Sequence, residues 1–359
     1  MMHRPARTAV SIVGIGVGVL LIIFTVGLAN GSLRDKARRE ANVGAEIMFS
    51  SAGTQGLSGS DSLRLPVALK NEIEQVEGVK TAVPIGQNTV SAGENSFGTR
   101  LVDGVNFDEY AQVAGLQIIE GRKFKDGADE AMTDTAWLPQ KNLKIGDAIK
   151  IYERDFRIVG TYEPSAGARV KIPLTTMQAQ LGAEGKASTI LVKIKDGFTA
   201  DQVVQNLQAK FPDNRIILTR ELEGIYMQSI PALNVFLNVV IGVAGGVSAL
   251  IILLTMYPTV TERTRQIGIL KSLGMSNARI AWTIVQEAML ISLCGTMLGV
   301  LLTVILKIMM TEWTTLTVQI EPHIVLVVAI IGALSGIAGA LYPALRASRL
   351  DAVEALSYE

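Results

Sequence analysis

The chain has 359 residues, of which 49% are apolar and only 18% are charged. This composition excludes an ordinary soluble enzyme, and the balance of 33 basic and 33 acidic residues gives no reason to expect a nucleic-acid partner. The one cysteine, Cys294, excludes an intrachain disulfide.

Four long apolar runs divide the chain. Each is longer than the roughly 20 residues that a helix needs to cross the hydrocarbon core of a membrane. Only the third run is interrupted by a charge, at Glu287. We therefore predict transmembrane helices over residues 8–29, 232–258, 280–310 and 323–345.

Basic residues beside the first run set the predicted orientation. Arg4 and Arg7 directly precede it, so the positive-inside rule places residues 1–7 in the cytoplasm. A cleaved signal peptide is the alternative, and we favour a retained anchor because the run is too long for a typical signal core. Two further segments, residues 259–279 and the tail 346–359, carry basic residues near the membrane and are predicted to lie inside. The loop over residues 311–322 holds only acidic charges and is predicted to lie outside.

Residues 30–231 then form one extracytoplasmic domain between the first and second spans. Its apolar patterns alternate between helix and strand spacing, which predicts an α/β (α+β) domain with a small sheet and helices on one face. Ser50–Ser62 is rich in Gly and Ser and indicates a mobile loop. Arg220–Ile230 is predicted to be a helical stalk. The other predicted elements are a helix over Pro66–Glu77, a strand over Val79–Ile85, a hairpin of Ala148–Tyr152 with Phe156–Tyr162 that turns at Glu153–Asp155, a strand over Ser188–Ile194, a helix over Thr199–Phe211 and a strand over Arg215–Thr219.

The loop between the second and third runs contains a predicted amphipathic helix, Thr261–Leu273. Its apolar residues fall within an arc of about 160°, as such a helix requires. We expect Pro258 to end the preceding helix, Gly274 to end this one and Ser276 to cap the next. The pattern fits either a docking element or a basic loop at the membrane surface.

The segment Glu262–Gly274, with the sequence ERTRQIGILKSLG, resembles the cytoplasmic signature of the FtsX-like/MacB-like permease family of ABC transporters. The segment Tyr342–Leu356 resembles the usual ending of that family. The resemblance implies that an ATPase docks on this helix, with Ile267, Leu270 and Leu273 as anchors and Glu262 and Arg263 at the rim. The same stretch of the signature also holds the glycines Gly268 and Gly274.

The resemblance also implies partners. It predicts a separate ABC ATPase subunit, a permease homodimer and, in a cell with two membranes, a periplasmic adaptor and an outer-membrane channel, with membrane lipids around the spans. ATP and magnesium would be bound by the ATPase, and no cofactor by this chain. Members of the family usually begin with a longer amphipathic helix than residues 1–7 provide.

We find no convincing catalytic motif in the sequence. The nearest approach to a P-loop, Gly185-Lys186-Ala187-Ser188, lacks the first glycine and has alanine after the lysine. The predicted outer domain has no His and no Cys, which excludes Ser-His-Asp and Cys-His nucleophiles, and Ser165 with Lys171 is best explained as part of a polar turn. We therefore predict a non-catalytic permease subunit with no metal site.

Within the spans, pairs of small residues four apart allow helix backbones to approach closely in lipid. Glu287 is an intramembrane charge and so a functional candidate by default, although a structural polar contact is the favoured interpretation. The glycine pairs are predicted to pack helices within the chain or along a dimer interface, and they are Gly14 with Gly18, Gly295 with Gly299, and Gly332 with Gly336.

Two functions stay open at this point. The first is a MacB-like permease that couples ATP hydrolysis by the ATPase subunit to conformational change outside the membrane, for the efflux or extraction of a drug, peptide, lipid or lipoprotein. The alternative is an FtsX-like signal transmitter that regulates a cell-wall hydrolase. The sequence places either one in the cell (inner) membrane as a multi-pass protein with both termini in the cytoplasm.

Overall fold

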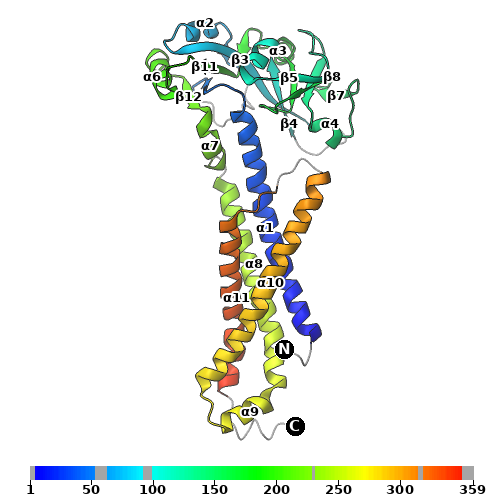
Figure 1. Ribbon diagram of the computed structural model, residues 1–359, viewed down its shortest axis with the longest axis vertical. Coiled ribbons are helices and arrows are strands. Elements are labelled where there is room, and N and C mark those ends of the chain that lie inside the picture. Colours follow the sequence, from blue (N-terminus) through cyan, green and yellow to red (C-terminus); the bar gives the residue numbers. More distant parts are fainter. Residues whose placement is uncertain (1–4, 53–62, 92–98, 229–230, 314–317, 350–359) are drawn as a thin grey trace. The chain divides into compact units, whose positions relative to one another are not determined.

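The computed structural model describes residues 5–52, 63–91, 99–228, 231–313 and 318–349. These residues form two compact units, which we describe separately (Figure 1). The helix bundle consists of Met1–Ser32 with Ile230–Glu359, and the α/β domain consists of Leu33–Ser229. Most of the predicted mobile loop Ser50–Ser62, the tail beyond residue 349 and part of the predicted outer loop 311–322 lie outside the described residues.

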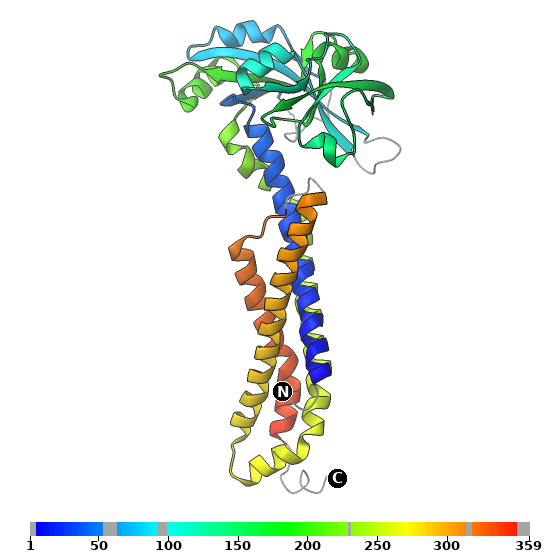
Figure 2. The same ribbon diagram turned by 45° about the vertical axis from the view of Figure 1, so that its right-hand side comes forward.

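The helix bundle contains, among its described residues, four helices that are long and apolar enough to cross a membrane. This confirms the predicted four-span fold. Helix α11 packs against both α8 and α10, and a short helix, α9, connects α8 to α10 at one end of the bundle (Figures 1 and 2). The bundle helices are α1 Pro5–Ala41, α8 Pro231–Glu262, α9 Thr264–Ser272, α10 Asn277–Trp313 and α11 Pro322–Ser348.

Helix α1 continues well past the predicted boundary at Ala29. The apolar run ends there, but the residues that follow are mostly good helix formers, so the helix persists to Ala41. From Leu33 onward α1 belongs to the α/β domain. The part of α1 that can cross a membrane therefore ends before the charged residues that begin at Arg34.

Pro258 does not end α8, contrary to the sequence-based expectation, and the helix runs on to Glu262. Threonine hydroxyls beside the proline donate hydrogen bonds to carbonyls of the preceding turn, including Thr259 Oγ1 to the Thr255 oxygen at 2.7 Å. The chain breaks instead at Arg263, so α9 begins later than predicted. Gly274 adopts a φ of +86° directly after α9, as predicted for the residue that stops it.

The α/β domain is built on a mixed sheet of ten strands among the described residues, which is larger than the small sheet expected. The strand order is β12-β1-β11-β3-β4-β9-β6-β8-β5, with β7 paired to β8. Only the β4–β9 and β6–β8 pairs are parallel. The strands are β1 Ile47–Ser50, β3 Val79–Ser91, β4 Thr99–Val105, β5 Gln117–Gly121, β6 Glu130–Asp134, β7 Ala148–Ile151, β8 Arg154–Glu163, β9 Val170–Pro173, β11 Thr189–Ile194 and β12 Arg215–Leu218, and a separate pair joins β2 Leu65–Pro66 to β10 Lys186–Ala187.

Helices cover both faces of this sheet, not one face as predicted. Strand β1 shows this directly: Ile47 and Phe49 pack in one apolar cluster with α2 and α6, whereas Met48 packs in another with α3 and α7. Successive side chains of a strand point to opposite faces, so each cluster fills one side. The helices are α2 Leu69–Glu74, α3 Phe107–Ala114, α4 Trp137–Gln140, α5 Leu174–Leu181, α6 Ala200–Lys210 and α7 Leu222–Gln228.

The predicted hairpin is present, but its turn lies one residue earlier than expected. Tyr152 and Glu153 link β7 to β8, and both have positive φ values, +53° and +61°. A two-residue hairpin turn with both φ values positive matches the right-handed twist of the strands. Tyrosine and glutamate are not typical of such a turn, which explains why the turn was predicted one residue too late.

Candidate functional site

Helix α9 has one buried face and one exposed face. Ile267 is buried and packs in an apolar cluster with Val260 of α8, Ile280 of α10 and Ala344 of α11, and Gly268 is buried beside it. Ile267 is therefore not an exposed anchor, which corrects the sequence-based assignment. The physical reason is that α9 is joined to α8 and α10 by very short connections, so it lies against the ends of the long helices and buries its inner side chain there.

Three other aliphatic side chains at this end of α9, Ile269, Leu270 and Leu273, are exposed, and we call them the α9 face. Leu273 is 79% exposed, and Ile269 and Leu270 are 44% and 40% exposed. Glu262 is also exposed, at the end of α8. Two of the predicted anchors, Leu270 and Leu273, thus remain available to a partner, and Ile269 takes the place of Ile267.

Arg263 and Glu287 are brought together although they were predicted to have separate roles. The Arg263 Nη1 atom lies 3.2 Å from Glu287 Oε2, and both side chains are partly buried. Arg263 occupies the break between α8 and α9, and Glu287 lies on α10. The ion pair fixes the start of α9 against α10, and it gives the charge of Glu287 a partner inside the bundle.

A second polar contact joins the ends of α8 and α11, and it could not be predicted from the sequence. The rings of Tyr257 and Tyr342 stack with centroids 6.1 Å apart. The Arg346 guanidinium lies over the Tyr257 ring, with Cζ 5.0 Å from its centroid, and donates a hydrogen bond to the Tyr257 hydroxyl. Cation–π contacts of this kind stabilise by about 0.5–1 kcal/mol at exposed sites.

Gly295 and Gly299 on α10 both face α1. A Cβ atom on Gly299 would lie 2.6 Å from the carbonyl oxygen of Gly16, and one on Gly295 would lie 2.7 Å from the Ile15 Cβ. Neither distance leaves room for a side chain. These two glycines therefore set the close approach of α1 and α10 within the chain.

The other glycine pairs also pack within the chain. Gly332 and Gly336 of α11 face α10, where the Ser292 hydroxyl donates a 2.6 Å hydrogen bond to the Gly332 carbonyl. Gly14 and Gly18 of α1 face α8: a Cβ atom on Gly14 would lie 3.2 Å from an Ile251 methyl, which is a tight contact, and one on Gly18 would lie 3.5 Å from the Ser248 hydroxyl, which is an ordinary contact. These contacts support the helix-packing role of the pairs.

The α/β domain contains a fully buried ion pair between Lys171 on β9 and Asp103 on β4. The Lys171 Nζ atom lies 3.0 Å from Asp103 Oδ2, and both side chains are 0% exposed. The ammonium also donates to the Ala166 carbonyl at 2.8 Å and lies 4.5 Å from the centroid of the Tyr110 ring. Burial lowers the pKa of Lys171, while the carboxylate of Asp103 opposes that shift. The predicted polar turn is different in detail, because Ser165 donates instead to Asp134, at 2.6 Å.

The charged C-terminal end of α1 takes part in a second group of ion pairs in the α/β domain. Asp35 accepts hydrogen bonds from Arg39 and from Arg169, and Arg169 also donates to Asp134 at 3.0 Å. Glu40, on the same end of α1, is 1% exposed. Burial raises the pKa of Glu40 to about 7, and the negative charge of Asp103 adds to the effect. Nothing in the sequence distinguishes Glu40 from the charged residues around it.

The comparisons with known proteins decide the family. Residues 8–210 match the family model of the MacB-like periplasmic core domain, and residues 238–352 match that of the FtsX-like permease C-terminal region. The chain belongs to the MacB-like/FtsX-like family of ABC permeases.

Full-length relatives of this permease are distant in sequence. The chain is 23% identical over 395 residues to the macrolide export ATP-binding/permease protein MacB of Bdellovibrio bacteriovorus, covering 99% of this chain and 60% of that protein. It is 25% identical over 394 residues to the MacB protein of Shewanella sp. strain ANA-3, covering 99% of this chain and 59% of that protein. The permease thus spans about 60% of the length of these relatives.

Solved structures that resemble the permease include the periplasmic region of MacB from Actinobacillus actinomycetemcomitans, with a TM-score of 0.39 and 16% identity, covering 52% of this chain and 95% of that one. Another is the extracellular domain of the noncanonic ABC-type transporter YknZ from Gram-positive bacteria, with a TM-score of 0.36 and 15% identity, covering 48% of this chain and 99% of that one.

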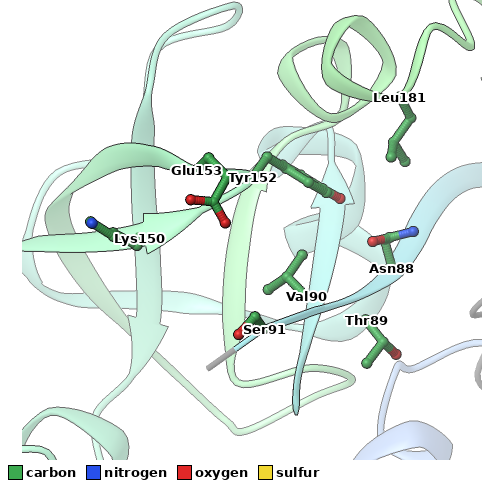
Figure 3. Close-up of a pocket in the computed structure, with 8 residues that line it drawn as sticks. All are labelled: Asn88, Thr89, Val90, Ser91, Lys150, Tyr152, Glu153 and Leu181. Atoms are coloured by element: carbon green, nitrogen blue, oxygen red, sulfur yellow. The ribbon is translucent and has the colours of Figure 1, made fainter. Parts of the chain in front are cut away.

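The α/β domain of the permease also has cavities at its surface. One of them has a volume of about 390 Å³ and lies between the end of β3 and the β7–β8 turn. Figure 3 shows the residues that line it. The Tyr152 ring extends toward Asn88 and Leu181, whereas Lys150 points away from them (Figure 3). Polar, charged and apolar side chains line this cavity, and they do not form a catalytic arrangement. Within the described residues, no group of three or more His, Cys, Asp or Glu side chains is placed to hold a metal ion.

Proposed function

We propose that this chain is the membrane-spanning subunit of an ABC transporter that couples ATP hydrolysis, by a separate ATPase subunit, to conformational change in the α/β domain. The observation that carries the proposal is the α9 face, an exposed aliphatic surface on a helix held rigidly between two spans. The match to both family models supports it. We propose export or extraction of a drug, peptide, lipid or lipoprotein as the purpose of this motion.

The orientation supports a docking role for α9. Basic residues flank the predicted cytoplasmic side of the first and last spans, and residues 259–279 carry four basic residues against Glu262 alone. We propose that α9 lies on the side of the membrane where ATP is present, with the α/β domain on the outer side and both termini in the cytoplasm, and this charge distribution supports the proposal.

The exposed area of the α9 face is large enough to matter for affinity. Burying one aliphatic side chain of this size is worth about 1.5–3 kcal/mol, and each 1.4 kcal/mol is tenfold in affinity. Ile269, Leu270 and Leu273 occupy i, i+1 and i+4, so Leu273 lies one turn from Ile269 on a helix surface that fits a groove. A groove on the ATPase accounts for these side chains better than solvent does.

Contacts inside the bundle provide a path for motion away from α9. The Arg263–Glu287 ion pair joins the start of α9 to α10, and the Tyr257–Arg346 contact joins α8 to α11. The tight glycine contacts leave little room for one long helix to slide independently of its neighbours. We propose that the bundle transmits displacement of α9 mechanically and does not form a conventional substrate channel.

The decisive experiment changes the α9 face. Leu273→Asp and Leu270→Asp are expected to leave the permease folded, because both side chains are exposed, while reducing co-purification of the ATPase and its ATP turnover tenfold or more. Gln266→Asp is the matched control, since Gln266 is an exposed polar residue of the same helix. Ile267→Asp should instead destabilise the bundle. The proposal fails if both leucine variants retain the ATPase as well as Gln266→Asp does.

A second function shares the same coupling helix. The alternative proposal is an FtsX-like transmitter that regulates a cell-wall hydrolase outside the membrane, and the match of residues 238–352 to the FtsX-like permease model is compatible with it. A permease homodimer is proposed for either function, whereas a periplasmic adaptor and an outer-membrane channel belong only to export. Purification under mild detergent distinguishes the two, because a transmitter is expected to retain a hydrolase and an exporter an adaptor.

A further inference from the structure

Two arginines close to the α9 face have no partner of their own. Arg265 lies in the first turn of α9, one turn before Ile269, and Arg279 lies in the first turn of α10, after the tight turn that ends α9. Both side chains are exposed. Neither side chain makes a hydrogen bond, an ion pair or a ring contact in the part of the chain that the structure describes. Arg263, by contrast, is held by Glu287.

The helices themselves do not stabilise these two cations. The N-terminal end of a helix carries the positive end of the helix dipole, so acidic residues stabilise the first turn and basic residues destabilise it. The first turns of α9 and α10 contain no acidic residue, and each holds one of the arginines instead. The positive-inside rule calls for basic residues on this side of the membrane, but not at these two positions. A partner with negative charge accounts for both.

The position of α9 along the bundle indicates that this partner is a protein. Tyr257 of α8 stacks on Tyr342 of α11, and Trp282 of α10 is exposed near the same end, as in an aromatic belt at the lipid headgroups. From these residues α8, α10 and α11 each extend five or six residues further, which is about 8 Å of helix. The headgroup region is only about 5–7 Å thick on each side of a bilayer. We therefore expect the α9 face to lie beyond the headgroups, where a protein and not lipid covers it.

We propose that the α9 face is received by an ATPase groove that has an apolar floor for Ile269, Leu270 and Leu273 and carboxylates at its rim that pair with Arg265 and Arg279. This inference rests on the proposed function, because it names the chemistry of the ATPase surface that meets α9. A guanidinium presents two parallel N–H groups that match a carboxylate. Charges at a rim mainly raise the association rate and fix the register, while the buried aliphatic side chains provide most of the affinity.

The test measures the affinity of the full permease for the ABC ATPase subunit that is expressed with it, in nonionic detergent without anionic lipid. The variants are Arg265→Gln, Arg279→Gln and the two combined. One exposed ion pair contributes a factor of about 1.5–5 in affinity, so the combined variant should bind about threefold to tenfold more weakly at low ionic strength. In about 1 M salt, where the screening length is about 3 Å, the difference should largely disappear.

Two controls show whether the arginines act at the interface. Lys80→Gln combined with Lys141→Gln removes two exposed charges from the α/β domain and should leave the affinity and its salt dependence unchanged. The arginine variants should not lower the thermal unfolding midpoint of the permease, since each removes a cation from a helix N-terminus. A lowered midpoint would show that the arginines stabilise the permease itself and would overturn the inference.

Leu273→Asp separates this inference from the proposed function. If Leu273→Asp retains the ATPase, α9 is not the docking site and both proposals fail. If Leu273→Asp loses the ATPase while the combined arginine variant binds as tightly as the parent at low salt, only the acidic rim is wrong. The rim is also wrong if the arginine variants weaken binding equally at low and high salt. It is wrong as well if they do so only after phosphatidylglycerol is added, because that result assigns the arginines to the membrane.

Discussion

Glu40 offers a quantitative test of the buried network in the α/β domain. Its pKa is raised from about 4.5 to about 7, chiefly by burial. Below pH 4.5 the folded and unfolded states both carry the proton, so the group has no effect on stability. As the pH rises toward 7, the unfolded state loses the proton more readily than the folded state, and the free energy of unfolding falls. Above pH 7 the loss in free energy of unfolding that Glu40 causes is constant, at about 3 kcal/mol.

Replacing Glu40 with glutamine removes this titration while keeping the shape of the side chain. We expect Glu40→Gln to match the parent at pH 4.5 and to exceed its free energy of unfolding by up to about 3 kcal/mol at pH 8. The assay is urea unfolding of the full chain in detergent, followed by Trp137 fluorescence in the background with Trp282→Phe and Trp313→Phe. The groups that act on Glu40 stay unchanged, and they are Lys36, Gln87, Asp103 and Tyr226.

Glu184→Gln is the matched control, because Glu184 is an exposed glutamate of the same domain. Its pH profile should follow that of the parent. The prediction is wrong if the difference in free energy of unfolding between Glu40→Gln and the parent does not grow from pH 4.5 to pH 8. That result would mean that burial does not raise the pKa of Glu40.

Two further variants test the packing of the molecule. Lys171→Met should lower the free energy of unfolding of the α/β domain by about 3–5 kcal/mol in urea, since it leaves Asp103 buried without its cation, and unchanged stability would contradict the buried ion pair. Gly299→Ala should lower the thermal unfolding midpoint in detergent, because its Cβ would lie 2.6 Å from the Gly16 oxygen. Gly246→Ala is the control and should not lower the midpoint, because its Cβ would have nothing within 4 Å. Equal midpoints for the two variants would show that α1 and α10 are not in close contact.

The four spans could be predicted from the sequence because membrane crossing depends on a single local property, the length of an apolar run. Helix ends could not be predicted as well. The apolar run of α1 stops at Ala29, but backbone hydrogen bonding continues to Ala41, since a helix does not require apolar side chains. Pro258 is a second example, because a proline favours the end of a helix, yet α8 continues past it to Glu262.

Periodicity located the apolar arc of α9 but did not say which part of it the protein itself covers. Ile267 and Leu273 lie in the same arc, yet Ile267 is 7% exposed and Leu273 is 79% exposed. A hydrophobic side chain fits the end of the bundle and a groove on a partner equally well. Only the packing of α9 against α10 and α11 separates the two uses.

The buried charges of the α/β domain were beyond sequence analysis because their partners are far apart in the chain. Asp103 and Lys171 are separated by 68 residues, and Asp35 and Arg169 by 134. Local patterns carry no information about such pairs. The sheet brings the first pair together, since β4 and β9 are adjacent parallel strands in which Asp103 lies opposite Lys171.

The contacts also suggest how the proposed motion reaches the α/β domain. Glu287 and Gly299 lie on the same helix, α10, so the contact of Arg263 with Glu287 and the contact of Gly299 with α1 belong to one rigid element. Helix α1 is continuous from Pro5 to Ala41 and carries Glu40 in the α/β domain at its other end. A displacement of α9 is therefore expected to pass through α10 to α1 by tight contacts alone.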